Sequence, residues 1–157
     1  MDWIIKLVAD GMVVPVALIG AYTLLRFVPH QQKYQVYARV VMAGLTAYVA
    51  AKIAGVLYQP SGLRPFELLG VEAGASFLNN PGFPSDHALF VTAITLAVAF
   101  GARQPKWALI AAVLSLLVCL GRVLALVHTP LDVVGGVLIA CVGVVWYVPL
   151  KRKQHSK

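Results

Sequence analysis

Three groups of polar residues interrupt an otherwise apolar chain, and their side chains are of the kinds that bind and transfer phosphate. They are Lys52 and Arg64, Ser85 and His87, and Arg122, His128 and Asp132. Histidines act as nucleophiles and proton donors, and cationic side chains bind phosphate oxygens. Polar side chains at the ends of membrane-length apolar segments are costly unless the protein uses them. We therefore expect the three groups to converge on one phosphate.

His128 and Asp132 lie four residues apart, with Thr129 and Pro130 between them. A threonine followed by proline, with an acidic residue three positions after the threonine, is typical of a helix start, in which Asp132 serves as the capping-box carboxylate. In the other interpretation, Asp132 holds one ring nitrogen of His128 and leaves the second nitrogen free to attack phosphorus. The two roles are compatible, and both stay open.

Ser85 and His87 stand at the start of the apolar run that continues to Gly101. One interpretation is a helix cap followed by a structural histidine. In the other, the serine hydroxyl and the free N–H groups of the helix start bind phosphate, and His87 donates a proton to the leaving oxygen.

A lone arginine near a membrane interface often extends its charged end to water. Arg64 and Arg122 together favour bidentate contacts to phosphate oxygens instead. The sequence shows no carboxylate cluster and no metal-ligand spacing, so we expect neither a metal nor a cofactor. His30 and His155 lie away from the three groups and are expected to be bystanders.

The composition indicates a membrane protein. Of the 157 residues, 60% are hydrophobic and 12% are charged, whereas a soluble domain is about half apolar and about a quarter charged. A soluble protein with a large helical core is the alternative. Cys119 and Cys141 both lie in apolar runs and are expected to be buried hydrophobic residues. No cleavable signal-peptide pattern is present at the start of the sequence.

The apolar runs predict an all-α fold, a polytopic transmembrane bundle of about five spans in a single domain, residues 1–157. The spans are expected at roughly 11–28, 34–58, 86–102, 107–127 and 129–150, each near the length that a bilayer requires. Residues 1–10 are expected to form a short interfacial segment, and residues 60–84 a loop with a short helix near 65–69. Small residues on the fifth span, among them Gly135 and Gly136, are expected to allow close helix packing.

Five crossings divide the 13 lysines and arginines unequally between the two faces. Nine fall on the face of the C-terminus, and four fall on the other: Lys6, Lys52, Arg64 and Arg122. The positive-inside rule therefore predicts a cytoplasmic C-terminus, with all three polar groups on the outer face. The basic tail then meets anionic headgroups, which explains the formal net charge of +7 without a nucleic-acid partner.

These residues resemble the three-part signature of the phosphatidic acid phosphatase type 2 superfamily. The first part is Lys52 followed, after a gap, by Arg64-Pro65, and the second is Pro84-Ser85-Asp86-His87. The third is Gly121-Arg122, five residues, His128, three residues, and Asp132. The resemblance covers roughly residues 50–145.

The resemblance implies a role for each matched residue. His128 becomes the nucleophile that forms phosphohistidine, Asp132 orients it, and His87 is the proton donor. Four residues are implied to bind phosphate: Lys52, Arg64, Ser85 and Arg122.

The sequence departs from the signature at three places. Gly121 replaces a serine, and Asp86 replaces a glycine in a variant similar to that of bacterial undecaprenyl pyrophosphate phosphatases. The gap from Lys52 to Arg64 is eleven residues and longer than the usual six, so either the Pro60-Ser61-Gly62 turn absorbs the extra length or Lys52 lies outside the site.

The sequence as a whole predicts a lipid phosphatase of a bacterial cytoplasmic membrane, with the bilayer and a phosphorylated lipid as its partners. Undecaprenyl pyrophosphate is the first-choice substrate, and phosphatidic acid or phosphatidylglycerol phosphate is the second. A lipid phosphotransferase is a further alternative. A non-enzymatic transporter or scaffold with an anion-binding vestibule is the alternative of another class. The oligomeric state is not predicted.

Overall fold

The computed structural model describes residues 3–58, 63–78, 80 and 82–148, and the regular structure in these residues is helical. The elements in chain order are α1 (Trp3–Lys6), the π-helical turn η1 (Leu7–Gly11), α2 (Val13–Phe27), the 3-10 turn η2 (His30–Gln32), α3 (Lys33–Leu57), α4 (Pro65–Leu68), α5 (Asp86–Leu96), the π-helical turn η3 (Ala97–Gly101), α6 (Pro105–Leu124), α7 (Pro130–Val142) and the 3-10 turn η4 (Gly143–Tyr147). The all-α prediction is confirmed.

Within the described residues, four helical segments are long and apolar enough to cross a membrane: Trp3–Phe27, His30–Leu57, Pro105–Leu124 and Pro130–Tyr147. A shorter apolar helix, Asp86–Gly101, is the fifth. These five segments match the five predicted runs, and α4 matches the predicted short helix. The segment expected at the interface, residues 3–10, continues directly into α2 as α1 and η1.

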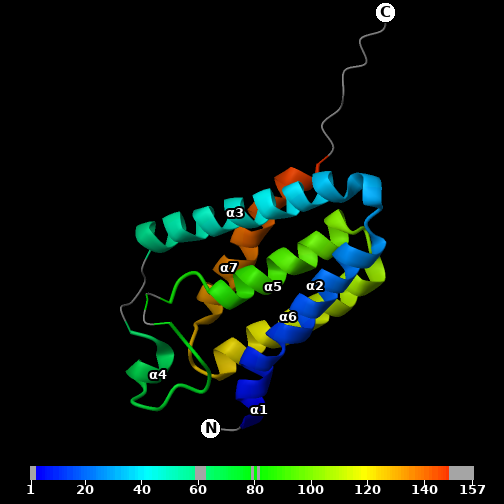
Figure 1. Ribbon diagram of the computed structural model, residues 1–157. Helices are drawn as coiled ribbons and strands as arrows, with labels where there is room; N and C mark the ends of the chain where they lie inside the picture. Colours follow the sequence, from blue (N-terminus) through cyan, green and yellow to red (C-terminus); the bar gives the residue numbers. More distant parts are fainter. Residues whose placement is uncertain (1–2, 59–62, 79, 81, 149–157) are drawn as a thin grey trace, which may run out of the picture.

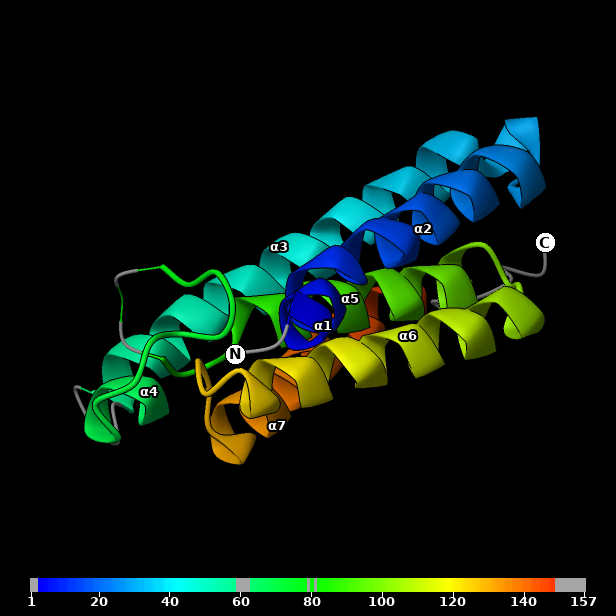
Figure 2. The ribbon, with the colours of Figure 1, turned by 90° about the horizontal axis from the view of Figure 1, so that it is seen from below.

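Helix α5 is the centre of the bundle. It packs against α2, α3, α6 and α7 (Figures 1 and 2). Together with η3 it forms the apolar helix Asp86–Gly101, whose 16 residues rise only about 24 Å, less than the roughly 30 Å of a bilayer core. Because neighbouring helices surround it, the polar start of α5 contacts protein instead of lipid. Protein groups can satisfy buried polar side chains there, which lipid tails cannot do.

The helices present small residues inward and large apolar residues outward. In α3 the buried positions are Ala43, Ala47 and Ala51, which recur every four residues and therefore share one face. Leu18, Leu116 and Leu138 are each 60% exposed or more. A soluble protein rarely exposes apolar surface so continuously, so this pattern is typical of helices that face lipid.

Helix α7 approaches α5 closely because it carries glycine at the contact. A Cβ atom on Gly136 would lie 2.6 Å from the carbonyl oxygen of Ser85 and 3.0 Å from the Cβ of Ala88. The expectation that small residues allow close packing here is confirmed. The contact places the start of α7 beside the start of α5, and both starts carry candidate site residues.

The two ends of the bundle differ. At one end the connections α2–α3 and α5–α6 lie together and line a pocket of about 550 Å³ with Arg39 and Arg103. At the other end lie α1, α4, residues 63–78 and 82–85, and the α6–α7 connection (Figures 1 and 2). All three polar groups belong to this second end, which we call the site end. The basic tail 151–157, the Pro60-Ser61-Gly62 turn and the end of the fifth predicted span lie outside the described residues.

The α5–α7 contact generates a stability prediction. Gly136→Ala should lower the free energy of unfolding by about 1–3 kcal/mol, because the added methyl group meets backbone atoms that cannot move aside. Gly44→Ala is the matched control, because a Cβ there meets no atom within 4 Å and alanine is the better helix former. Thermal unfolding in detergent micelles measures both, and equal midpoints for the two variants would contradict the packing described here.

Candidate active site

His128 and Asp132 form a buried pair at the start of α7. Their exposed fractions are 5% and 4%. The Nδ1 atom of His128 lies 3.6 Å from Oδ2 of Asp132, longer than a hydrogen bond, and this nitrogen has no hydrogen-bond partner within the described residues.

The same carboxylate also caps α7. The backbone N–H of Thr129 donates to Oδ2 of Asp132 over 2.7 Å, and the Thr129 hydroxyl accepts from the backbone N–H of Asp132 over 3.2 Å. The capping-box interpretation is thereby confirmed. The cap holds Asp132 with its Oδ2 atom toward His128. One conformation of the Asp132 side chain can therefore both cap the helix and orient the histidine.

The electrostatic surroundings keep His128 neutral. Burial is the largest effect and lowers the pKa of His128, and the positive charges of Arg122 and Arg64 lower it further. The Asp132 carboxylate opposes them and raises it, but the pKa remains below the ordinary histidine value. A neutral ring keeps a free lone pair on one nitrogen, which is the form of histidine that attacks an electrophile.

Arg64 is the residue that immediately precedes α4, and its side chain extends into the site. Its backbone N–H donates to Oε2 of Glu67 over 2.6 Å, which closes the cap of α4. Its guanidinium is buried and donates to four acceptors: the carbonyl oxygens of Val127, Leu78 and Asn80 and the side-chain oxygen of Asn80. These bonds, 2.6–3.1 Å long, hold the guanidinium beside the residue that precedes His128.

Gly82 shows how close Arg64 comes to Asp132. A Cβ atom at Gly82 would lie 3.3 Å from Oδ2 of Asp132 and 3.9 Å from Nη1 of Arg64. The two side chains therefore flank one backbone position. Desolvation by burial lowers the pKa of Arg64, while the negative charges of Asp132, Glu67 and Asp86 act in the opposite direction.

Arg122 is the most deeply buried of the large side chains at the site, with 1% exposed. Its Nη1 donates to Oδ1 of Asp10 over 2.7 Å, and its Nη2 donates to the carbonyl oxygen of Ser76 over 2.7 Å. Its Nε–H has no partner among the described residues. An unpartnered buried donor beside a neutral histidine is a group that an incoming anion can satisfy.

Ser85 and His87 lie at the start of α5, as the sequence predicts. The Ser85 hydroxyl accepts from the backbone N–H of Ala88 over 3.4 Å, and the Ser85 backbone N–H donates to the carbonyl oxygen of Asp132 over 2.9 Å. The helix-cap interpretation of Ser85 is thereby confirmed. His87 is half-buried and lies within electrostatic reach of Arg122, Asp10 and His128. Both histidines therefore belong to one cluster of ionisable side chains that interact electrostatically.

Lys52 lies to one side of this cluster. Its Nζ is 3.3 Å from Oδ1 of Asp86 and 5.0 Å from the ring centroid of Tyr48, and its side chain is 49% exposed. Asp86 is the residue that replaces the signature glycine, so the departure supplies the charge partner of Lys52. Lys52 and Asp86 also line a pocket of about 170 Å³ with Asn80, Phe83 and Pro84. A phosphate-binding role for Lys52 stays a prediction.

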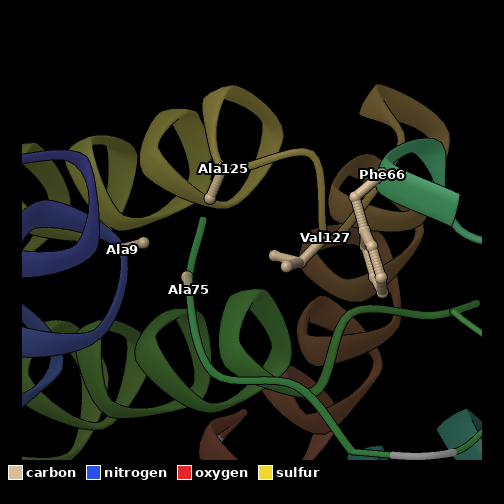
Figure 3. Close-up of a cluster of buried hydrophobic side chains, with 5 residues drawn as sticks. All are labelled: Ala9, Phe66, Ala75, Ala125 and Val127. Atoms are coloured by element: carbon tan, nitrogen blue, oxygen red, sulfur yellow. The ribbon is translucent and has the colours of Figure 1, made fainter. Parts of the chain in front are cut away.

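A small apolar cluster holds the segments of the site together. It consists of Ala9, Phe66, Ala75, Ala125 and Val127, which come from η1, α4, the loop before α5 and the α6–α7 connection (Figure 3). Each lies within three residues of a charged or polar site residue. Packing of these five side chains therefore brings Asp10, Arg64, Ser76, Arg122 and His128 together.

Sequence reasoning missed Asp10, Ser76, Asn80 and Gly82. Asp10 had a detectable signal, because an acidic residue in an apolar helix at the end that carries Arg122 suggests a charge pair. Ser76 and Gly82 contribute backbone atoms or local space, which residue type does not reveal. Asn80 contributes its side-chain oxygen as well as its carbonyl oxygen, but it lies in a loop where no local pattern distinguishes it. Within the described residues, no group of three or more His, Cys, Asp and Glu side chains is placed to hold a metal ion.

Comparison with known proteins identifies relatives of this sequence. The sequence profile of the PAP2 superfamily matches residues 26–156. The chain is 29% identical over 143 residues to undecaprenyl-diphosphatase BcrC of Bacillus subtilis strain 168, an alignment that covers 90% of this chain and 70% of that protein. It is 34% identical over 115 residues to an undecaprenyl-diphosphatase of Sulfolobus acidocaldarius, covering 66% of this chain and about half, 53%, of that protein. No solved structure matches the chain.

The surroundings of His128 generate a pH prediction. Its pKa should lie below about 6.5, the ordinary histidine value, because burial and two guanidinium charges outweigh Asp132. As the pH falls, the unfolded chain binds this proton first, so the native state loses stability between about pH 6.5 and the lower native pKa. NMR titration of ring-labelled histidine in detergent measures the value, with His128→Gln assigning the resonance. Asp132→Asn should lower the pKa of His128 further, and a rise in that variant would contradict the account.

Proposed function

The chain belongs to the PAP2 superfamily, and we propose that this multi-pass membrane phosphatase removes the terminal phosphate of a polyprenyl diphosphate of the undecaprenyl type. The observation that carries the proposal is the buried pair of His128 and Asp132. The positive charges of Arg64 and Arg122 lie close enough to this pair to lower the pKa of His128. A transporter or scaffold that only binds an anion would use the two arginines but has no need for a histidine held neutral by burial and oriented by a carboxylate.

The first step of the proposed reaction forms a phosphohistidine. The Nδ1 atom of His128 faces Asp132, so Nε2 carries the lone pair that attacks the terminal phosphorus. The P–O bond to the lipid monophosphate breaks, and His87, which the negative charge of the bound diphosphate favours in its protonated form, gives its proton to the departing oxygen. Arg64 and Arg122 stabilise negative charge on the equatorial oxygens, which is the main contribution a protein makes to phosphoryl transfer.

The second step releases phosphate. Water attacks the phosphohistidine, the N–P bond breaks, and His87, neutral after the first step, takes the proton from the water. Inorganic phosphate leaves, and both histidines return to their starting protonation states. Asp132 retains the proton on Nδ1 of His128 throughout, which makes the ring the better leaving group.

Two connected pockets along α3 and α5 support a lipid substrate. The first, about 530 Å³, begins at Lys52 and Asp86, and the second, about 390 Å³, continues between α2, α3 and α5. They share Gly44, Phe90 and Ala93. An apolar groove that starts beside a phosphate site suits a diphosphate headgroup with a hydrocarbon tail. The names of the two relatives favour a polyprenyl tail over a glycerolipid.

The charge distribution supports placing the active site on the outer face of a bacterial cytoplasmic membrane. Among the described residues, the end opposite the site carries five predicted cytoplasmic cations: Arg26, Lys33, Arg39, Arg103 and Lys106. Positive charge concentrates on the cytoplasmic side of membrane proteins. The diphosphate would then be hydrolysed on the non-cytoplasmic side.

Substitutions at the start of α7 separate the catalytic and capping roles of Asp132. His128→Ala should abolish phosphate release, a fall on the order of 10⁴-fold or more. Asp132→Asn should lower kcat by ~100-fold or more, because the amide keeps the cap but no longer holds the proton on His128. Thr129→Ala should cost about 1 kcal/mol of stability and leave kcat nearly unchanged, because it removes the hydroxyl half of the cap but keeps the backbone N–H that holds Oδ2 of Asp132.

These variants are compared by phosphate release from purified protein in detergent micelles and by thermal unfolding of the same samples. His30→Ala, which alters an exposed histidine at the opposite end, is the control and should keep wild-type activity. Phosphate release by His128→Ala at the wild-type rate would remove His128 as nucleophile.

A lipid panel tests the substrate. Undecaprenyl diphosphate, phosphatidic acid and phosphatidylglycerol phosphate are presented to the wild-type enzyme at equal surface concentration. We expect the largest kcat/KM for undecaprenyl diphosphate and one inorganic phosphate per lipid monophosphate formed. A preference for either glycerolipid would contradict the polyprenyl assignment. Phosphate that appears on a second lipid instead of in solution would show a phosphotransferase.

A further inference from the structure

Asp10 lies in the apolar N-terminal helical segment and reaches two other parts of the site. Its Oδ1 accepts from Nη1 of Arg122 over 2.7 Å, and its Oδ2 accepts from the backbone N–H of Ser76 over 2.9 Å. Ser76 in turn accepts from Nη2 of Arg122 through its carbonyl oxygen. Asp10, Ser76 and Arg122 therefore close a ring of three hydrogen-bonded contacts.

The local helix geometry directs Asp10 to this position. Residues Leu7–Gly11 form a π-helical turn, in which the backbone N–H of Met12 donates to the carbonyl oxygen of Leu7 over 3.2 Å. A π-helical turn accommodates one extra residue and shifts the side chains that follow, and such turns are frequent at functional sites. Ala9, within this turn, is fully buried beside Ala75 and Ala125 (Figure 3).

Gly121 permits the approach of this turn to α6. A Cβ atom on Gly121 would lie 2.8 Å from the backbone nitrogen of Ala9, 2.9 Å from its Cα and 3.1 Å from a methyl group of Val8. The serine that the signature carries at this position does not fit against these atoms. The loss of the signature hydroxyl and the presence of Asp10 are therefore two parts of one contact, in which glycine makes room for the segment that delivers the carboxylate.

The carboxylate fixes the direction of the Arg122 guanidinium. A guanidinium has five N–H donors in a rigid plane. Contacts from Nη1 to Asp10 and from Nη2 to Ser76 define that plane, while Nε–H has no partner among the described residues. The buried positive charge of Arg122 also depends on Asp10. Its guanidinium is only 1% exposed, and a charge buried to this extent requires a partner of opposite charge.

We propose that Asp10 is a positioning residue of the phosphatase site, which holds Arg122 so that its free N–H donors meet the equatorial oxygens of the transferring phosphate. The proposal rests on the proposed function. Asp10 itself does not touch the phosphate in this arrangement. It acts through Arg122, and its removal affects the transition state more than the binding of the lipid, which also depends on the apolar groove.

The test compares Asp10→Ala, Asp10→Asn, Gly121→Ser and the double variant Asp10→Ala/Gly121→Ser, all purified at full length in detergent. Glu72→Ala is the matched control, because it removes an exposed carboxylate from residues 63–78. Three quantities are measured: kcat and KM for undecaprenyl diphosphate, the inhibition constant or binding constant of orthovanadate, which adopts the geometry of phosphoryl transfer, and the unfolding midpoint.

Asp10→Ala should lower kcat by about 100-fold, the effect of misplacing a catalytic group by about 1 Å, with little change in KM, and should weaken orthovanadate binding. Asp10→Asn should fall between Asp10→Ala and wild type, because the amide keeps an acceptor for Arg122 but places an N–H against that of Ser76. Gly121→Ser should lower kcat although it restores the signature hydroxyl. The double variant should be no slower than the slower single variant, because both changes break one contact. Glu72→Ala should match wild type.

Two results with the Asp10 variants would overturn the positioning role. One is unchanged kcat in Asp10→Ala and Asp10→Asn with an active wild-type enzyme. The other is tighter orthovanadate binding without Asp10, which would show that the carboxylate competes with phosphate for Arg122. Higher activity in Gly121→Ser would equally contradict it. If the wild-type enzyme releases no phosphate from any lipid, the proposed function fails, and orthovanadate binding by calorimetry still decides whether Asp10 supports the anion site. Asp10→Asn retains the side-chain shape if Asp10→Ala does not fold.

Discussion

The burial of two guanidinium groups at one end of a helical bundle is the constraint on which the rest of the site depends. A buried charge without partners costs several kcal/mol, so Arg64 and Arg122 require acceptors that apolar helices do not supply. The acceptors come from the irregular segments: the carbonyl oxygens of Ser76, Leu78 and Val127, the Asn80 backbone and side chain, and the Asp10 carboxylate. Satisfying the arginines therefore determines the path of the loop before α5 and of the connection before α7.

The same constraint explains why the proposed reacting groups lie at this end of the bundle. The connection that gives its Val127 carbonyl oxygen to Arg64 presents His128 next, and the cap of α7 places Asp132 beside that ring. The start of α5 is tied to the start of α7 through the bond from Ser85 to Asp132. Positive charge near a buried histidine lowers the histidine pKa, so the groups that would attract phosphate also keep the proposed nucleophile neutral.

Much of this could be predicted from the sequence, because it is encoded locally. Apolar runs between turn residues defined the five helices, and Thr129-Pro130 with Asp132 specified the start of α7. The polar groups could be assigned to one end because each membrane-length helix carries the chain to the opposite end of the bundle, so successive connections alternate between the two ends. The contacts that sequence reasoning missed are made between residues distant in the chain or by backbone atoms, which are the same in every residue. Asp10 and Arg122 are 112 residues apart, and three of the four acceptors of the Arg64 guanidinium are backbone carbonyl oxygens, which any residue supplies. Gly121 looked like a lost hydroxyl, whereas in the structure it is the space that Ala9 occupies.

The central claim is that residues from separate segments form one site in which His128 attacks phosphorus. Its most direct test is to mix the enzyme with undecaprenyl diphosphate, stop the reaction with alkali within one turnover, and map the phosphorylated residue by mass spectrometry. The account predicts phosphate on His128 in the wild-type enzyme, and none in Asp132→Asn quenched at the same time. Turnover with phosphate on another residue, or with no phosphoenzyme at any time within one turnover, would contradict it.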